Sequence, residues 1–154
     1  MKRAIIVFII LLMISSGFAD DAKTPESLAG KFVAVVNAKK QKELRGLIHP
    51  KCFTNLSLIQ KQFIDETNSR AFQKIIPESY KLKVSKLEEG KLPFADMMEW
   101  QVNPTHQIEI EFSTGEYSST SIIRFIVKKK DQWFLVIPML NKENMKEYEK
   151  RKTD

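Results

Sequence analysis

The sequence predicts an α+β fold in which N-terminal helices pack on a curved antiparallel sheet of four to six strands. Two observations carry this prediction. Apolar residues recur every three or four positions up to about residue 76, as on the buried face of a helix, and at every second position from residue 80 onward, as in a half-buried strand. Helices that precede the strands, instead of alternating with them, favour a helical layer on one face of a sheet.

The composition is typical of one compact domain. The 154 residues are 43% hydrophobic and 29% charged, with only 5 Gly and 6 Pro. This apolar fraction is too high for a disordered chain, and so few Gly and Pro exclude a collagen-like or linker-like one. A single cysteine excludes an intramolecular disulfide and a zinc site built from several thiolates.

The first 19 residues have the three parts of a secretory signal peptide. Lys2 and Arg3 precede an apolar run at residues 4–14, and small residues precede a potential cleavage site after Ala19. The run is shorter than the roughly 20 residues of a membrane-spanning helix, so an uncleaved anchor is the less favoured alternative. We therefore expect an exported protein, periplasmic or secreted, that meets the membrane only through this segment before cleavage.

Three helical segments are expected after the signal segment. The first begins with Thr24 as N-cap and Pro25 in its first turn. The second is shorter and ends before Pro50, because the residue that precedes a proline is disfavoured in the helical conformation. The third runs from about residue 56 to residue 76, with a polar interval at residues 65–69 that could divide it.

Four or five strands are expected to follow the helices. Each shows apolar residues at alternate positions, and the segments begin near residue 80 and then cover residues 98–102, 106–112, 117–129 and 133–137. A hairpin turn is expected at residues 113–116, and Pro138 ends the last strand or marks an edge. A folded domain is thus expected at residues 20–140, followed by a charged C-terminal tail at residues 141–154.

Two segments resemble the NTF2-like superfamily, the cone-shaped α+β fold of nuclear transport factor 2, ketosteroid isomerase and SnoaL-type cyclases. TPESLAGKFVAVVNAKKQKELRGLIHP at residues 24–50 is similar to the first helical hairpin of that family, and SIIRFIVKKKDQWFLVIPM at residues 121–139 to its last two strands. The resemblance covers most of residues 24–140. It implies a sheet wrapped around one long helix, with a conical cavity as the default ligand site.

Four residues are candidates for the lining of such a cavity: Tyr80, Trp100, His106 and Phe63. Catalytic members of the family place an Asp or His base and Tyr or Asp donors inside the cone, which makes His106 the candidate base and Tyr80 a candidate donor. The complete catalytic set does not match residue by residue. We favour a histidine satisfied at the cone mouth or on the open sheet face, and aromatic side chains that serve as core.

Other residues with reactive side chains are expected to have structural roles. Cys52 and His49 lie close in the sequence, but a closed metal site needs about four ligands, so no metal is expected. Cys52 is interpreted as a buried thiol, with a nucleophile paired to His106 or a bridge between two chains as alternatives. Glu109 and Glu111 share the strand face opposite the apolar one and are expected in solvent. No phosphate loop or nucleophile elbow is present, and no cofactor is expected.

The charge pattern bears on the partners of the protein. The formal charge of +6 falls to +4 without the signal segment, and no sustained basic face with interleaved aromatics is evident, so nucleic acid is not an expected partner. We expect an exported, non-catalytic NTF2-like domain that binds a small apolar or amphipathic ligand in its cone. The alternatives are an adaptor or homodimer that uses the sheet face, and an isomerase- or hydratase-type enzyme with His106 as base.

Overall fold

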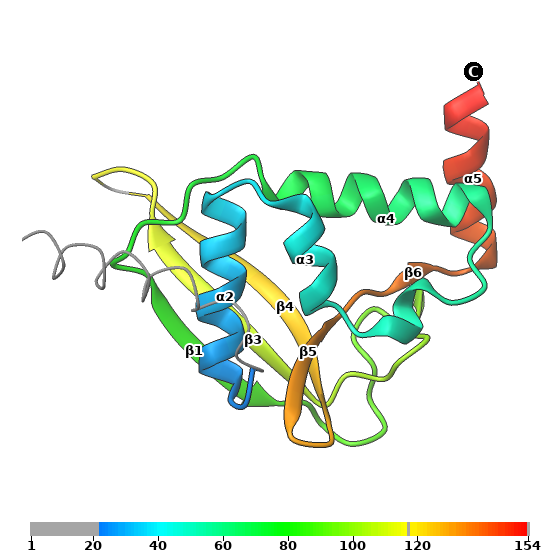
Figure 1. Cartoon of the computed structure of the whole chain (residues 1–154). Helices are drawn as coiled ribbons and strands as arrows, with labels where there is room; N and C mark the ends of the chain where they lie inside the picture. The colour runs from blue at the N-terminus through cyan, green and yellow to red at the C-terminus, as the bar shows by residue number, and fades with distance from the viewer. Residues whose placement is uncertain (1–21, 117, 154) are drawn as a thin grey trace, which may run out of the picture.

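The computed structural model describes residues 22–116 and 118–153, so the signal segment expected at residues 1–19 lies outside the described part. Helices come before the sheet along the chain, as expected (Figure 1). The elements are α2 (Pro25–Asn37), α3 (Gln41–Leu47), the 3-10 helix η1 (Pro50–Phe53), α4 (Leu58–Ala71), β1 (Lys81–Lys86), β2 (Met98–Glu99), β3 (His106–Ser113), β4 (Ser119–Lys129), β5 (Gln132–Val136), β6 (Met139–Leu140) and α5 (Lys142–Thr153).

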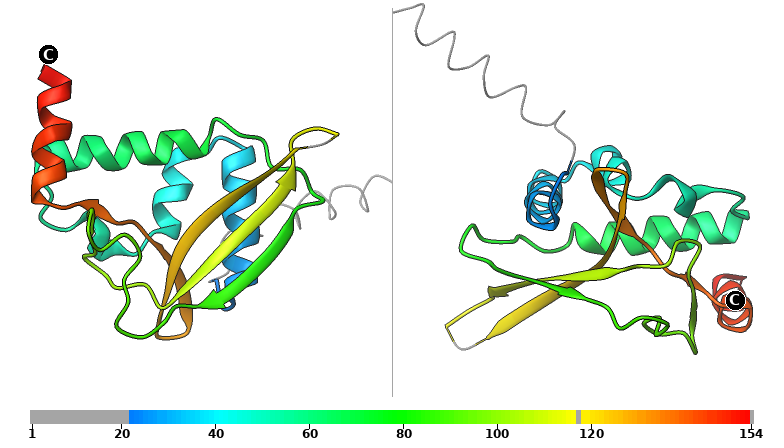
Figure 2. Two further views of the ribbon diagram at one scale, coloured as in Figure 1. Left: turned by 180° about the vertical axis from the view of Figure 1, so that it is seen from behind. Right: turned by 90° about the horizontal axis from the view of Figure 1, so that it is seen from below.

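The main sheet is antiparallel and has the strand order β1-β3-β4-β5. In its register Ile110 of β3 stands opposite Leu82 of β1 and Ile122 of β4. A separate two-stranded ribbon pairs β2 with β6. The sheet is curved, and α2 and α3 lie on one of its faces while α4 crosses above α3 (Figures 1 and 2). The predicted α+β class, with helices on a curved antiparallel sheet, is therefore confirmed.

Helix α2 begins as the sequence predicts. The Thr24 hydroxyl oxygen accepts from the backbone N–H of Ser27 at 3.1 Å, and the Ser27 hydroxyl oxygen accepts from the backbone N–H of Thr24 at 3.1 Å. Pro25 occupies the first helical position, where its missing N–H has no partner to lose. Because these bonds satisfy N–H groups that have no intrahelical partner, they fix where the helix begins.

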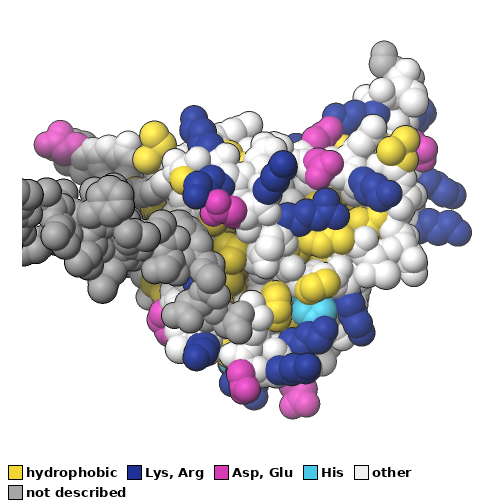
Figure 3. Space-filling view, in the orientation of Figure 1, with side chains coloured by type: hydrophobic (Ala, Val, Ile, Leu, Met, Phe, Trp, Pro, Cys, Tyr) yellow, Lys and Arg dark blue, Asp and Glu magenta, His cyan; other side chains and the backbone are white. Residues whose placement is uncertain are grey.

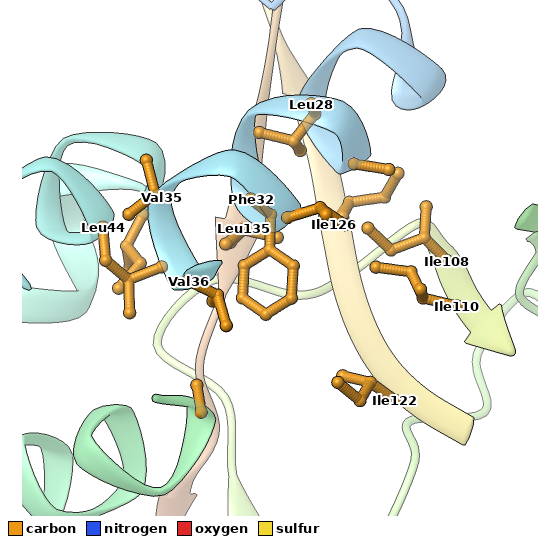
Figure 4. Close-up of a cluster of buried hydrophobic side chains, with 14 of the residues drawn as sticks. Leu28, Phe32, Val35, Val36, Leu44, Ile108, Ile110, Ile122, Ile126 and Leu135 are labelled. Carbon is orange, nitrogen blue, oxygen red and sulfur yellow. The ribbon is translucent and has the colours of Figure 1, made fainter. Parts of the chain in front are cut away.

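The core forms between α2 and the concave side of the sheet. Figure 4 shows Phe32 of α2 directed toward the strands that carry Ile108 and Ile126, and Val35 turned toward Leu44 of α3. These side chains are at most 2% exposed. Full burial of one such side chain contributes about 1.5–3 kcal/mol, so this interface is the main source of stability for the fold.

The third helix differs from its predicted bounds at its C-terminal end. It ends at Ala71, five residues before the expected end, and it runs unbroken through the polar interval at residues 65–69. In that interval the Thr67 hydroxyl donates to the carbonyl of Phe63 at 2.8 Å and the Ser69 hydroxyl to that of Asp65 at 2.7 Å. These hydroxyl groups donate hydrogen bonds to carbonyls of the preceding helical turn, so they do not interrupt the helix.

The strand expected at residues 98–102 is reduced to Met98–Glu99, which pairs with β6 outside the main sheet. Trp100 does not continue the strand, because its side chain contacts other parts of the chain. Its indole N–H donates to the carbonyl of Pro93 at 3.0 Å, and its ring packs edge-on against Phe125 at 5.1 Å between centroids. Apolar residues alternate with polar ones both in a strand and in a loop whose apolar side chains are buried at separate places. The alternation therefore does not distinguish the two.

The segment expected to be a charged tail forms helix α5, which projects beyond the body of the molecule (Figure 1). Met145 is 9% exposed, and the Tyr148 ring meets Phe63 of α4 edge-on at 5.5 Å. Lys152 bonds to the carboxylate of Glu66 on α4. Met145 and Tyr148 are three positions apart and so share one helix face. This apolar face is difficult to recognise in the sequence because most residues of the segment are charged.

Candidate functional site

A hollow of about 190 Å³ lies between the helices and the strands β4 and β5. Its lining comes from α2, α3 and the residue that follows it, α4, β4, β5 and the two residues that follow β5. The lining is mainly apolar: Phe32, Leu44, Ile48, Thr67, Asn68, Ala71, Ile123, Arg124, Phe125, Leu135, Val136, Ile137 and Pro138. In Figure 3 apolar surface is visible below α4, next to Lys and Arg side chains. The hollow is partly open to solvent.

The hollow exists because α4 turns short side chains toward the strands. Thr67, Asn68 and Ala71 are its contribution to the lining. Longer apolar residues at these positions would fill the space, since protein interiors are normally packed to crystal-like density. Leu135 and Ile48 also line the hollow, and a parallel bridge between them joins the segment after α3 to β5.

Arg124 is the one charged residue in this lining among the residues that the structure describes. It belongs to β4, opposite Ile108 of β3, and its neighbours on the same strand face are Ile122 and Ile126. Both isoleucines are buried, at 8% and 0% exposure. A cation therefore stands in a row of side chains that is otherwise apolar, at the wall of the hollow.

The Arg124 guanidinium has few partners. Its central carbon lies 5.1 Å from the centre of the Phe32 ring, and Nη1–H donates to the carbonyl of Ile123 at 2.9 Å. In the described part of the chain, its contacts include no carboxylate within 4.0 Å. Burial lowers the pKa of this guanidinium from its ordinary value, because removal from water penalises the charged form.

Arg124 is not among the pocket residues that the sequence predicts. A signal existed: a charged residue in SIIRFIV, a stretch whose apolar residues fill both strand faces. Alternation assigns Arg124 to the same face as Ile122 and Ile126, and a charge on a core face is unusual unless it has a partner. The sequence does not show where α4 lies. The position of α4 determines that a hollow adjoins this residue.

His106 and Tyr80, the candidate base and donor, do not converge. His106 begins β3 opposite Lys86, whereas Tyr80 precedes Lys81, the partner of Glu111 at the other end of β3. The levels of His106 and Tyr80 are therefore six residues apart along the strands, which corresponds to about 20 Å. Joint action requires both groups within about 3 Å of one reacting position, so these two residues do not form an isomerase-like site.

His106 is partly buried at the end of the sheet. Its ring meets Trp133 edge-on at 5.0 Å, and Nδ1 lies 3.0 Å from the hydroxyl of Thr105. Burial, followed by the nearby charge of Lys86, lowers its pKa. The side chain thus has an aromatic neighbour and a polar one, and it does not line the hollow.

The other candidate pocket residues also lie outside this lining. Trp100 covers the outer face of the sheet through its contact with Phe125, Phe63 packs in a second small core with Tyr148, and Tyr80 packs at the edge of the main core. All three are half-buried, Phe63 on a helix and Tyr80 and Trp100 in or next to strands. Which half-buried residues share a hollow depends on how the helices cross the sheet.

Cys52 and His49 are buried in the structure, at 2% and 4% exposure. The His49 Nδ1 accepts from the backbone N–H of Lys51 at 3.2 Å and caps the 3-10 helix, and its ring meets Phe134 edge-on at 5.4 Å. Burial raises the pKa of the Cys52 thiol. Nowhere in the described part of the chain do three His, Cys, Asp or Glu side chains gather as metal ligands would.

Glu109 and Glu111 lie on the outer face of the sheet, where Glu111 is exposed, as expected, and Glu109 is half-buried. In the register they stand opposite Lys83 and Lys81 of β1. Opposite charges at facing positions of antiparallel strands stabilise the pairing by about 0.2–1 kcal/mol. The two carboxylates therefore face lysine positions of β1, and neither lines the hollow.

Comparison of the chain with protein-family models, with curated proteins and with solved structures finds no match. Of the helices that the structure describes, none has the length and apolar character needed to cross a membrane.

Proposed function

We propose that this protein is an exported, non-catalytic NTF2-like domain that binds a small apolar or amphipathic ligand. The observation that supports the proposal is the apolar hollow between α3, α4 and the strands β4 and β5. An apolar cavity of about 150 Å³ is enough to bind benzene. A hollow of about 190 Å³ is therefore suited to one ring or a short alkyl chain, with room for a longer ligand to extend into solvent.

Weaker support exists for the two alternatives. The separation of His106 from Tyr80 removes the pair on which the isomerase-type hypothesis depended. For an adaptor, the exposed large apolar residues of the described chain come from four separate segments, namely α4, the turn after it, the loop before β2, and β4: Leu58, Ile75, Phe94, Met97 and Ile123. A homodimer through the sheet would appear as twice the chain mass in light scattering.

The test is to fill the hollow and measure binding of a neutral apolar probe. Octan-1-ol should bind the wild-type protein and raise its melting temperature, because a ligand that binds only the folded state stabilises it. Ala71→Phe places a ring in the hollow and should weaken octan-1-ol binding by about tenfold or more, since the lost burial corresponds to several methylene groups.

Ser69→Phe is the matched control, because Ser69 is an exposed residue of the same helix and does not line the hollow. It should leave binding unchanged. Thr67→Leu is a second filling variant, in case the larger ring destabilises the fold. Failure of the wild-type protein to bind octan-1-ol, or equal binding by the filled and unfilled proteins, would contradict the proposed function.

A further inference from the structure

Arg124 is half-buried at the wall of the hollow, and most of its hydrogen-bonding capacity is not used by the described chain. Arginine carries five N–H donors in a planar fork, and the structure accounts for one of them, at the Ile123 carbonyl. Partial removal of a charge from water is unfavourable unless the charge is paired, and the face of the Phe32 ring, 5.1 Å from the guanidinium carbon, offsets part of that cost. The guanidinium is therefore a strong hydrogen-bond donor with unused capacity at the wall of a hollow.

The rest of the lining defines what could use this capacity. The described lining contains no Asp, Glu, Lys or second Arg, so the hollow carries a single positive charge. Thr67 and Asn68 on α4 also line it and are neutral groups able to donate or accept hydrogen bonds. The remaining residues are apolar. One cation in apolar surroundings is matched by a monoanion with an apolar body.

From these observations, and resting on the proposed function, we infer that the ligand is a small amphipathic carboxylate whose headgroup pairs with Arg124 and whose apolar part fills the hollow. The guanidinium fork matches the two oxygens of a carboxylate, which allows two parallel hydrogen bonds. A phosphate monoester would bring nearly two negative charges to a hollow with one cation, so the carboxylate is the better match for charge.

The test compares two probes that differ only in the headgroup, octanoate and octan-1-ol. Wild-type protein should bind octanoate about tenfold or more tightly than octan-1-ol, as expected for a hydrogen bond to a charged partner. Arg124→Leu removes the cation, and Arg124→Gln keeps hydrogen-bonding capacity without charge. Both variants should lose the preference for octanoate while they still bind octan-1-ol, which also reports that the hollow remains folded.

Arg45→Leu is the matched control. Arg45 also stacks on an aromatic ring, with its guanidinium carbon 4.4 Å from the centre of Phe53, but it is exposed and does not line the hollow. This variant should retain the octanoate preference of the wild type. An effect on preference at Arg124 but not at Arg45 separates ligand pairing from a general contribution of stacked arginines to stability.

The outcomes separate this inference from the proposed function. If wild-type protein binds octan-1-ol and octanoate equally, or if both Arg124 variants retain the preference, the inference is overturned while the proposed function stands. If wild-type protein binds neither probe, both are overturned. A preference in the wild type that disappears in both variants supports both.

Discussion

The side chain of Asn37, at the end of α2, pairs with both backbone groups of Ile76. Its amide N–H donates to the Ile76 carbonyl at 2.7 Å, and its Oδ1 accepts from the Ile76 N–H at 2.9 Å. The two residues are 39 positions apart, and Ile76 is 1% exposed in the main core. This contact gives the buried backbone of Ile76 the partners that a helix or strand would otherwise provide, and it explains how the chain after α4 returns to the core.

We expect Asn37→Ala to lower the free energy of unfolding by about 2 kcal/mol, because it leaves the buried N–H and carbonyl of Ile76 without partners. Urea unfolding followed by circular dichroism measures the change. Asn103→Ala is the control, since Asn103 is exposed, and should change stability by less than about 0.5 kcal/mol. Equal small effects for the two variants would show that the contact contributes little.

Replacement of Lys39 by glycine should stabilise the protein. Lys39 follows α2 with φ of 55°, and its N–H and that of Lys40 bond back to the carbonyls of Val36 and Val35, the pattern that usually places glycine at this position. Because a left-handed conformation costs a residue with a Cβ about 1–2 kcal/mol and glycine almost nothing, Lys39→Gly should raise the free energy of unfolding by about 1 kcal/mol. Lys39→Ala keeps the Cβ and should bring no such gain, as thermal and urea unfolding can determine.

Stability should fall as the pH drops below about 6.5. Burial lowers the pKa of both His49 and His106, with smaller contributions from Lys129 and Lys51 at His49 and from Lys86 at His106. Below the ordinary histidine pKa of about 6.5 the unfolded chain binds protons that the folded chain does not, so acidification favours unfolding. The stabilisation is present above that pH and is lost as the pH falls toward the lowered pKa of each group.

Urea midpoints measured from pH 8 to pH 5 check this sign. The double variant His49→Asn, His106→Gln removes both titrating groups and should flatten the profile in this range. Asparagine retains an acceptor for the Lys51 N–H, so the 3-10 helix keeps its cap. A double variant with the same pH slope as the wild type would assign the slope to other groups.

Cys52 should be unreactive in the folded protein. The thiol is 2% exposed, and burial raises its pKa, so both access and thiolate formation are suppressed. Iodoacetamide at pH 8 should label it only after unfolding in urea, as read by intact mass, and a non-reducing gel of the folded protein should show monomer. Rapid labelling of the native protein, or a disulfide-linked dimer, would contradict the buried position.

Much of the fold could be predicted from local patterns. Thr24 and Pro25 define the start of α2 because capping is a matter of adjacent residues, and the alternation at residues 106–112 and 117–129 places β3 and the body of β4. The end of α4 could not be predicted, because Ile75 and Ile76 continue the apolar pattern of the helix. In the structure the backbone of Ile76 is instead hydrogen-bonded to the side chain of Asn37. The candidate site was missed for the same reason, since no local pattern records the crossing of α4 over the strands.

By itself, the sequence determined the α+β class, the order of the elements from α2 to the strands of the main sheet, and the faces of β3 and β4 on which their residues lie, because these follow from periods of 3.6 and 2 along the chain. The tertiary structure alone decided that Arg124 borders a hollow, that His106 and Tyr80 lie at opposite ends of β3, and that residues 142–153 pack on α4 as a helix. These relationships join segments that are distant in the chain, and they depend on how the helices cross the sheet, which no short-range pattern encodes.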